Sequence, residues 1–143
     1  MIYVDTSCLV KLLRIEEDSE SVAAAVSKES DAIVSSLAEL ETLIELKAGY
    51  MAGDYSMAQW RKLEAHVQAL RDQEPFHFKP IPAGIWETAF RQHRNSREIH
   101  CRTLDRLHLA ALEKLGISRL MTHDAAQATA ARELEIEVVR PAR

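Results

Sequence analysis

Short apolar runs alternate along this chain with longer segments in which apolar residues recur at helical spacing. The short runs are typical of buried strands, whereas the longer segments are typical of helices with one apolar face. The expected strands cover residues 2–4, 32–35, 76–81, 117–122 and 137–140. The expected helices cover residues 6–13, 21–30, 36–52, 57–71, 85–93, 103–115 and 125–134. Strands separated by helices indicate β-α-β units, so we expect a single α/β domain over residues 1–143 with a mostly parallel sheet.

Polar residues mark the expected start of three helices. Ser36 and Glu39 have the spacing of a capping box, in which the serine hydroxyl and the glutamate carboxylate each bind a backbone N–H group. Thr103 is expected to cap the helix that ends before Gly116, and Asp124 is expected to cap the helix that follows. The apolar face predicted for helix 36–52 consists of Leu37, Leu40, Ile44, Ala48 and Met51.

Composition and charge narrow the class of protein. With 47% apolar and 28% charged residues, the 143-residue chain has the composition of a soluble globular domain. No apolar run approaches the roughly 18 residues of a membrane span, and the N-terminus lacks the basic segment of a secretory signal. Cys8 and Cys101 are too few for a disulfide framework, so we expect a cytoplasmic protein. A net charge of −4 argues against nucleic-acid binding by a basic surface alone.

Carboxylates stand where the predicted strands end or the following helices begin. Asp5 directly follows the first strand, and Asp124 follows the strand that ends near Met121. Asp105 lies in the first turn of a helix, and Glu41 lies early in the helix after the second strand. In open parallel α/β sheets, functional groups gather beyond the carboxyl ends of the strands. We therefore expect these side chains to lie together at one edge of the sheet.

Each aspartate beside a helix also has a purely structural explanation. An aspartate at a helix N-cap stabilises the helix by about 0.5–2 kcal/mol, and this explanation suits Asp105 and Asp124 as well as a functional role does. Taken together, however, the acids repel one another, because two like charges ~4 Å apart cost about 4 kcal/mol at an effective dielectric constant of ~20. A divalent cation or partial protonation would offset that cost. Ligand sets made only of oxygen indicate a hard metal ion, Mg²⁺ or Mn²⁺, which commonly serves phosphate chemistry.

Other kinds of catalytic or cofactor site find little support in the sequence. The six histidines are scattered and no Cys-x-x-Cys motif occurs, so a zinc site is not expected. Neither of the common glycine-rich phosphate-binding motifs is present. Cys8 with His108 or His123 is a conceivable thiol–imidazole pair, but the apolar neighbours of Cys8 favour a packing role. His108, one turn after Asp105, is likewise interpreted as a structural histidine.

One segment indicates a phosphate substrate. Between residues 90 and 106 the chain carries five arginines against two acids, Glu98 and Asp105, although the protein as a whole is acidic. Arginine is suited to bidentate contacts with phosphate. A solvated helix end explains the first arginines of this segment at least as well. Arg102, three residues before Asp105, is the better candidate for a substrate contact.

Four segments, in this order, resemble the motifs of PIN-domain ribonucleases. They are IYVDTS at residues 2–7, VSSLAELE at 34–41, RTLDRLHLA at 102–110 and LMTHD at 120–124. The resemblance covers essentially the whole chain, whose size and motif order are similar to those of the VapC toxins of prokaryotic toxin–antitoxin pairs. It implies a three-layer α/β/α fold with a mostly parallel central sheet of four to five short strands. It also implies a Mg²⁺- or Mn²⁺-dependent endoribonuclease that is held inactive by a cognate antitoxin protein and forms a homodimer.

The resemblance also assigns roles to individual residues. The family's catalytic acids fall on Asp5, Glu41, Asp105 and Asp124. The three aspartates are the implied metal ligands, and the glutamate orients the attacking water or completes the metal shell. Thr6 and Thr122 match the small hydroxyl positions that flank the acids, and together with Arg102 they are the expected substrate contacts.

Glu41 rather than Glu39 is expected to be the catalytic glutamate. Being two residues apart, the two side chains differ by about 200° around a helix and cannot both face one site. Glu39 has a local role in the expected capping box, whereas Glu41 falls where the resemblance places the family's acid, five residues after Ser36. Glu45, one turn further along, is a weaker candidate.

Two other functions are left open by the sequence. A non-catalytic PIN-fold module that only binds a partner would be expected to lack some of the acids, but this chain has all four. A metal-dependent phosphatase of the haloacid-dehalogenase type also begins with a strand and an aspartate. It needs a second aspartate two residues later, where this chain has Ser7.

Overall fold

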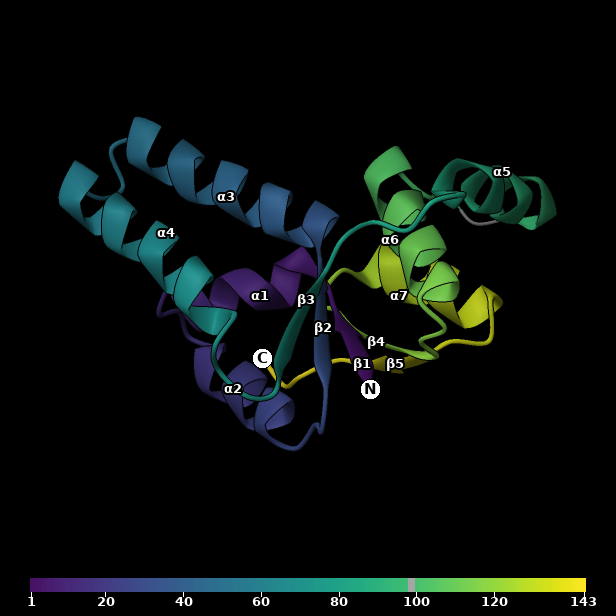
Figure 1. Ribbon diagram of the computed structural model, residues 1–143, viewed down its shortest axis with the longest axis horizontal. Helices are drawn as coiled ribbons and strands as arrows, with labels where there is room; N and C mark the ends of the chain where they lie inside the picture. Colours follow the sequence, from purple (N-terminus) through teal and green to yellow (C-terminus); the bar gives the residue numbers. More distant parts are fainter. Residues whose placement is uncertain (98–99) are drawn as a thin grey trace.

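A parallel sheet of five short strands lies at the centre of the described part of the chain (Figure 1). The computed structural model describes residues 1–97 and 100–143, so Glu98, one of the acids in the arginine-rich segment, lies outside the described residues. The strands are β1 (Ile2–Val4), β2 (Ala32–Ser35), β3 (Phe76–Lys79), β4 (Arg119–Met121) and β5 (Glu137–Val139). Their order across the sheet is β3-β2-β1-β4-β5, and each neighbouring pair is parallel. The strand that leads into Asp5 is therefore the central one.

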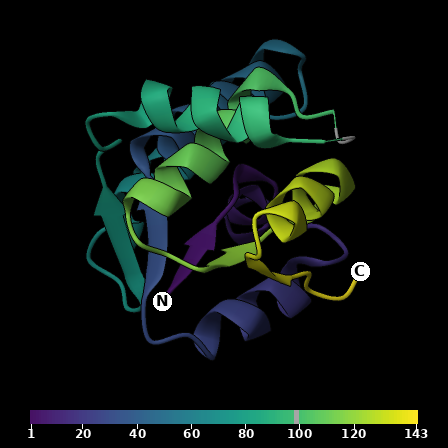
Figure 2. The same ribbon diagram turned by 90° about the vertical axis from the view of Figure 1, so that its right-hand side faces the viewer.

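Helices cover both faces of this sheet (Figures 1 and 2). They are α1 (Thr6–Leu13), α2 (Ser19–Ser27), α3 (Ser36–Met51), α4 (Met57–Leu70), α5 (Ile85–Asn95), α6 (Thr103–Lys114) and α7 (Ala125–Glu133). The first four pack on one face and the last three on the other. Within residues 1–97 and 100–143, none of these helices combines the length and the apolar character needed to cross a membrane.

Alternation along β1 divides the core into two parts. Ile2 and Val4 are buried against the side chains of α1 to α4, whereas Tyr3 is buried against those of α5 to α7. Successive side chains of a strand point to opposite faces of a sheet, and both faces of a sheet covered by helices are apolar. The predicted three-layer α/β/α architecture is confirmed, and the ends of its predicted elements differ from the observed ones by at most three residues.

The start of α3 differs from the sequence-based expectation. Its N-cap is Ser35, whose Oγ accepts a hydrogen bond from the backbone N–H of Ala38 at 3.1 Å. The Oγ of Ser36 instead accepts a bond from the backbone N–H of Ile81 at 2.9 Å, and Glu39 pairs with Arg71, the C-cap residue of α4. The predicted capping box at Ser36 is therefore wrong. Either serine can serve as an N-cap, although only Ser36 has a glutamate three residues later. The last residue of β2, Ser35, occupies the cap position because α3 begins directly where the strand ends.

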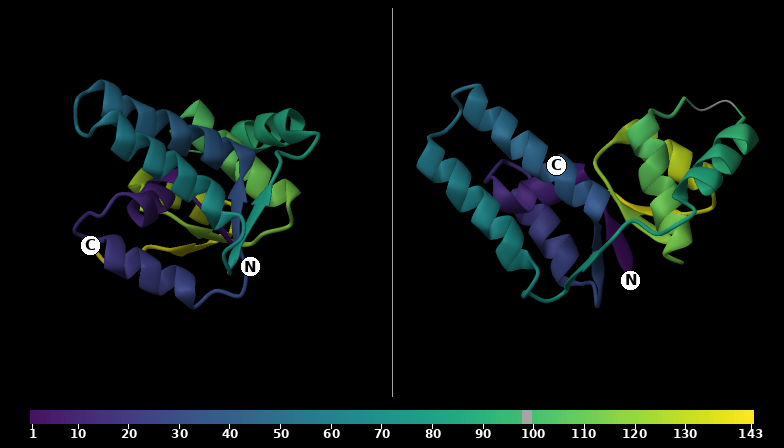
Figure 3. Two further views of the ribbon diagram at one scale, coloured as in Figure 1. Left: turned by 60° about the vertical axis from the view of Figure 1, so that its left-hand side comes forward. Right: turned by 45° about the horizontal axis from the view of Figure 1, so that its top comes forward.

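The apolar face predicted for α3 is also wrong, because most of it is exposed. Leu40, Ile44 and Met51 are 55%, 59% and 75% exposed. The buried side consists of Ala38, Thr42, Leu46 and Gly49. These are mostly small residues, and they allow α3 to lie close beside α1 and α4 (Figure 3).

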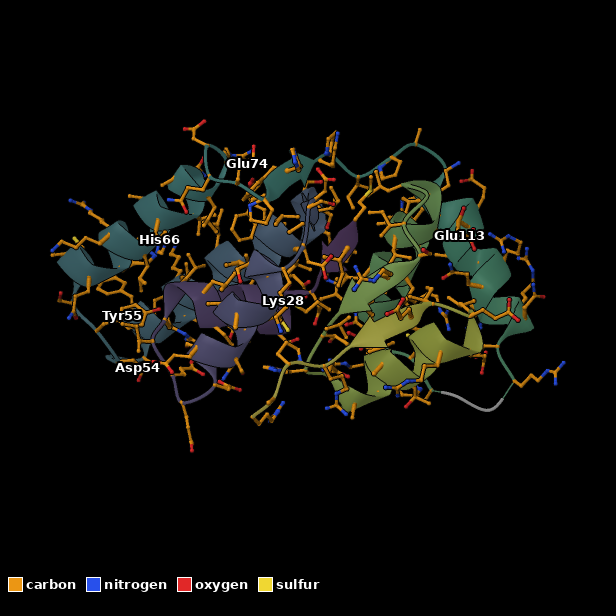
Figure 4. All side chains as sticks on the ribbon, turned by 90° about the horizontal axis from the view of Figure 1, so that it is seen from below. Lys28, Asp54, Tyr55, His66, Glu74 and Glu113 are labelled. Atoms are coloured by element: carbon orange, nitrogen blue, oxygen red, sulfur yellow. The ribbon has the colours of Figure 1, made fainter. Side chains whose placement is uncertain are left out.

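A close contact at the far end of α3 shows why this face must be small. A side chain at Gly49 would collide with the ring of Tyr55, which lies in the turn between α3 and α4. Tyr55 in turn donates a hydrogen bond to the backbone carbonyl of Leu46. Figure 4 shows this tyrosine at the end of the molecule away from Glu113 of α6.

Of the two N-caps predicted for α6 and α7, the first is wrong and the second is confirmed. The N-cap of α6 is Arg102, without a side-chain cap, so the prediction that Thr103 caps this helix is wrong by one residue. Asp124 caps α7 as predicted, since its Oδ1 accepts a bond from the backbone N–H of Gln127 at 2.8 Å. Asp105 is not a cap, and this removes the main structural explanation for its position.

Candidate active site

Asp5 is fixed at the carboxyl end of the central strand. Its backbone N–H donates to the carbonyl of Met121 on β4 at 2.9 Å, and its side chain caps α1. The Oδ2 atom accepts hydrogen bonds from the Oγ of Ser7 at 2.7 Å and from the backbone N–H of the same residue at 3.3 Å. The Ser7 hydroxyl accepts a bond from the backbone N–H of His123 at 3.0 Å. These bonds orient a carboxylate that is only 6% exposed.

Thr122 and Gln127 complete the support of this carboxylate. The Oγ1 of Thr122 donates to Asp5 Oδ2 at 3.0 Å and accepts from the backbone N–H of Asp124, also at 3.0 Å. With its amide nitrogen facing the carboxylate, Gln127 donates to both oxygens of Asp5, at 3.3 and 3.1 Å, and to Thr122 Oγ1 at 2.9 Å. Both residues are fully buried. The end of β4 and the first turn of α7 therefore determine the direction in which Asp5 points.

Glu41, on α3, lines the same cavity as Asp5. Its Oε1 atom accepts a hydrogen bond from Thr6 Oγ1 at 3.0 Å and is also hydrogen-bonded to Nε2 of His108. Burial alone raises the pKa of Glu41. The hydrogen bond from His108, the charge of its ring when protonated, the bond from Thr6 and the charge of Arg102 outweigh this effect, so the pKa lies below its usual range. Glu41 is therefore a carboxylate at neutral pH.

Glu39 points elsewhere. It lies with Arg71, Ser36 and Phe78 in a separate shallow pocket and does not line the cavity that Glu41 lines. Glu45 also borders the cavity of Glu41, where it pairs with Arg14 at 3.0 Å.

Arg102 joins the two remaining acids. Its Nε donates to Asp105 Oδ2 at 2.9 Å, and its Nη2 donates to Asp124 Oδ2 at 3.1 Å. The hydrogen bond from the guanidinium to Asp105, together with the charges of Asp105, Asp124 and Asp5, raises the pKa of Arg102. The arginine side chain is itself 70% exposed. A largely exposed cation therefore lies between carboxylates that would otherwise repel one another.

All four predicted acids line one cavity of about 340 Å³, together with Arg102, Thr6 and His108. The acids come from the end of β1, from α3, from the first turn of α6 and from the start of α7. In the part of the chain that the structure describes, no three His, Cys, Asp or Glu side chains are close enough to form a ready ligand set for a metal ion. The donor chemistry nevertheless fits Mg²⁺ or Mn²⁺, because carboxylate oxygens are the ligands these ions prefer. The position of the Arg102 guanidinium between two of these carboxylates supports the same fit, because it shows that the site accommodates positive charge.

The three expected substrate contacts differ in their positions. Arg102 reaches the cavity and is exposed. Thr6 borders the cavity, but its hydroxyl is bonded to Glu41. Thr122 is fully buried and does not border the cavity, since its hydroxyl is bonded between Asp5 and Asp124.

Two other arginines of the 90–106 segment, Arg91 and Arg106, have partners away from the four acids. Arg91 pairs with Glu113 on α6, and Arg106 is buried, with its Nη1 donating to the side-chain oxygen of Gln92 at 3.2 Å. The concentration of positive charge in the sequence therefore does not form one patch at the cavity.

Cys8 has the environment of a packing residue. It is fully buried within the core on the α1 side of the sheet. Burial and the charge of Asp5 raise the pKa of its thiol to about 12. A thiol with this pKa is protonated at neutral pH and is a poor nucleophile, in agreement with the interpretation made from its apolar neighbours.

The sequence did not point to three residues that shape this site. Ser7 and Gln127 hold Asp5, and Tyr3 donates or accepts a hydrogen bond at Nδ1 of His108 over 2.6 Å. Only Gln127 carried a usable signal, because it is a polar residue three positions after Asp124 in a helix rich in alanine.

Three comparisons place this geometry among known proteins. The sequence matches the model of the PIN domain over residues 2–133. It is 31% identical over 147 residues to ribonuclease VapC35 of Mycobacterium tuberculosis, covering 99% of this chain and 97% of that protein. It is 28% identical over 142 residues to ribonuclease VapC46 of the same organism, covering 98% and 97%.

The fold has a close counterpart in a solved structure. The crystal structure of Mycobacterium tuberculosis VapC20, a sarcin-ricin loop cleaving toxin, is similar with a TM-score of 0.67 and 18% sequence identity. The similarity covers 91% of this chain and 95% of that one. From the family model and the identity to VapC35 together, the chain belongs to the PIN-domain family, and its relatives there are VapC ribonucleases.

Proposed function

We propose that this chain is a Mg²⁺- or Mn²⁺-dependent endoribonuclease and the toxin of a toxin–antitoxin pair, acting as a single domain in the cytoplasm. The observation that carries the proposal is the cavity in which four carboxylates from four separate elements meet Arg102. Membership of the PIN-domain family and likeness to VapC ribonucleases support the choice of RNA as the substrate.

Each side chain at the cavity has a distinct role in phosphodiester hydrolysis. Asp5, Asp105 and Asp124 would hold the metal ion. When bound, a metal ion supplies charge stabilisation at a phosphoryl oxygen and lowers the pKa of a water molecule. Glu41 is ionised, so it accepts a hydrogen bond from the attacking water and orients it. Arg102, released from its aspartate partners, contacts a phosphate of the RNA.

Removal of divalent cations is expected to abolish cleavage. The measurement is cleavage of total RNA by the purified chain with Mg²⁺ or Mn²⁺, in excess EDTA, and after the metal is restored. We expect activity only in the first and third conditions, because the carboxylates alone provide no positive charge for the transition state. Undiminished cleavage in EDTA contradicts the proposal, as does cleavage retained by the Asp5→Asn variant.

Thermal unfolding of the same preparation, with and without metal, distinguishes a nuclease from an inert PIN-fold module. A nuclease that binds metal at these acids should show a higher midpoint of thermal unfolding with Mg²⁺ or Mn²⁺ than with EDTA, because a ligand of the folded state stabilises it. The Asp5→Asn variant should lose most of this increase. An inert module would show neither metal-dependent stabilisation nor cleavage.

A homodimer and a separate antitoxin chain are the proposed protein partners. Large apolar side chains lie exposed on α3, among them Ile44 at 59% and Met51 at 75%. Others lie exposed on α5, among them Trp86 at 56% and Phe90 at 57%. Exposed apolar groups of this size commonly belong to protein interfaces. Family membership supports the two partners, and these helices offer surfaces on which they would dock.

Ile44→Glu is expected to convert the dimer to a monomer. A buried charge without a partner at an interface is strongly destabilising, so the mass measured by light scattering should fall from about twice 16.2 kDa to 16.2 kDa. Ile15→Glu is the matched control, since Ile15 is 98% exposed and lies in the connection after α1. A wild-type monomer at micromolar concentration would contradict the dimer.

A further inference from the structure

A chain of hydrogen bonds runs through the core to the catalytic glutamate. The Oγ of Ser35 lies 2.6 Å from the phenol oxygen of Tyr3, and this oxygen lies 2.6 Å from Nδ1 of His108. The other ring nitrogen of His108, Nε2, is hydrogen-bonded to Oε1 of Glu41. Tyr3 and Ser35 are fully buried and His108 is 1% exposed, so water does not compete for these bonds.

When the imidazole of His108 is neutral, each hydrogen bond in this series has one possible donor. An ionised carboxylate only accepts hydrogen bonds, so Nε2 of His108 must donate to Glu41. Nδ1 is then an acceptor, and Tyr3 donates to it. Ser35 donates to Tyr3 and accepts from the backbone N–H of Ala38 at 3.1 Å. Each group in the chain thus has a partner, and the imidazole is held in one tautomer.

The series of hydrogen bonds ends at Oε1 of Glu41. Thr6 and His108 both bind Oε1. In the described residues no hydrogen bond is formed to Oε2, and the Glu41 side chain is 24% exposed at the cavity. One oxygen is therefore anchored, and the other can accept a hydrogen bond from a water molecule in the cavity that Glu41 lines. The distance from His108 Nε2 to Asp5 Oδ1, 3.8 Å, is too long for a hydrogen bond, so the imidazole acts on Glu41.

We propose that His108 and Tyr3 are positioning residues for Glu41, which hold its carboxylate in the orientation required for water activation. This inference rests on the proposed ribonuclease function. It replaces the view of His108 as a packing histidine, because packing alone does not require both ring nitrogens to be bonded in line with a cavity carboxylate. Residues that orient a functional group commonly change activity by about 10–100-fold when they are removed.

Two substitutions at His108 separate its two bonds. Asparagine keeps a polar group near the Nδ1 position and loses the bond to Glu41, whereas glutamine keeps one near the Nε2 position and loses the bond to Tyr3. We expect kcat of His108→Asn to fall by about 10–100-fold with KM little changed. His108→Gln should retain several times more activity than His108→Asn. Thermal unfolding of both variants is measured in parallel, so that a loss of kcat can be compared with a loss of stability.

Tyr3→Phe tests the outer link with a smaller change to the core. It removes only the hydroxyl, and kcat should fall by a smaller factor than in His108→Asn, because Glu41 keeps its bond to the imidazole. Tyr50→Phe is the matched control, since Tyr50 stacks on Trp60 away from the cavity, with 4.9 Å between ring centroids. This control should leave kcat unchanged.

Repeating these substitutions in the Glu41→Gln variant separates their effect on Glu41 from folding defects. In Glu41→Gln, neither His108→Asn nor Tyr3→Phe should reduce the residual rate further, because the group they position is gone. Three outcomes would each overturn the inference. They are a wild-type kcat in His108→Asn, equal losses of kcat in His108→Asn and His108→Gln, and full additivity of the losses in the Glu41→Gln variant. If both His108 variants fail to fold, the effect of Tyr3→Phe on kcat in the wild type and in the Glu41→Gln variant decides whether the inference holds. Absence of metal-dependent cleavage in the wild type would instead overturn the proposed function, and this inference with it.

Discussion

Asp105→Asn should reduce RNA cleavage at least about 100-fold while the protein stays folded. A metal ion contributes several kcal/mol of charge stabilisation, and each 1.36 kcal/mol corresponds to a factor of ten in rate. Asp105 does not cap α6, and its recorded side-chain partner is the largely exposed Arg102. Its structural contribution is therefore limited to the favourable position of a carboxylate near a helix start, and we expect a stability loss of about 1 kcal/mol or less.

Thermal unfolding and RNA cleavage measured on the same Asp105→Asn preparation decide between the two roles. Asp54→Asn is the control, because Asp54 is an exposed acid in the turn between α3 and α4 and does not line the cavity. Figure 4 shows it at the end of the molecule away from Glu113. It should match the wild type in both measurements. An active but destabilised Asp105→Asn variant would return this residue to a purely structural role.

Glu41→Gln should be folded and inactive apart from a small residual rate, whereas Glu39→Gln should be active. Glutamine keeps the size of the Glu41 side chain but removes the charge that accepts the hydrogen bond of an attacking water. Glu39 lies outside the cavity and pairs with Arg71 on the surface of α3 and α4. Surface ion pairs of this kind contribute about 0–1 kcal/mol, so the loss of this one should be small.

The two glutamate variants serve as controls for each other, because they make the same chemical change two residues apart on one helix. Cleavage rates and unfolding midpoints are compared side by side. An inactive Glu39→Gln with an active Glu41→Gln would mean that the cavity seen here is not where RNA is cleaved. Equal loss in both would indicate a general effect on α3.

The elements of this fold were accessible from the sequence because each has a local signature. The apolar run before Asp5 predicted the first strand, and the position of Asp5 at its end placed this carboxylate at the functional edge of the sheet. Asp124 was placed by the same rule, whereas Asp105, which follows no strand, was placed by its position in the first turn of a helix and by the resemblance. Asp5 and Asp124 line one cavity because β1 and β4 are parallel neighbours.

What the sequence could not reveal depends on contacts between distant segments. The exposed stripe with Leu40 and Ile44 has the same periodicity as a buried face, and only contacts such as the close approach of Tyr55 to Gly49 show which side of α3 is covered. The bond between Tyr3 and His108 joins residues 105 positions apart. Nothing local in either residue indicates it, because alternation places Tyr3 on a sheet face but does not choose its partner.

The central position of β1 has a consequence for the timing of toxicity during synthesis. The first strand pairs with β4, with Tyr3 opposite Leu120, and Gln127 must be in place before Asp5 is fully supported. At roughly 5–20 residues per second, about 6 to 25 seconds separate translation of the first acid from that of its last supporting residue. A ribosome-bound chain therefore carries no assembled site before Gln127 has been translated, and products of premature termination before β4 would lack Asp124 and the strand and glutamine that hold Asp5 in place.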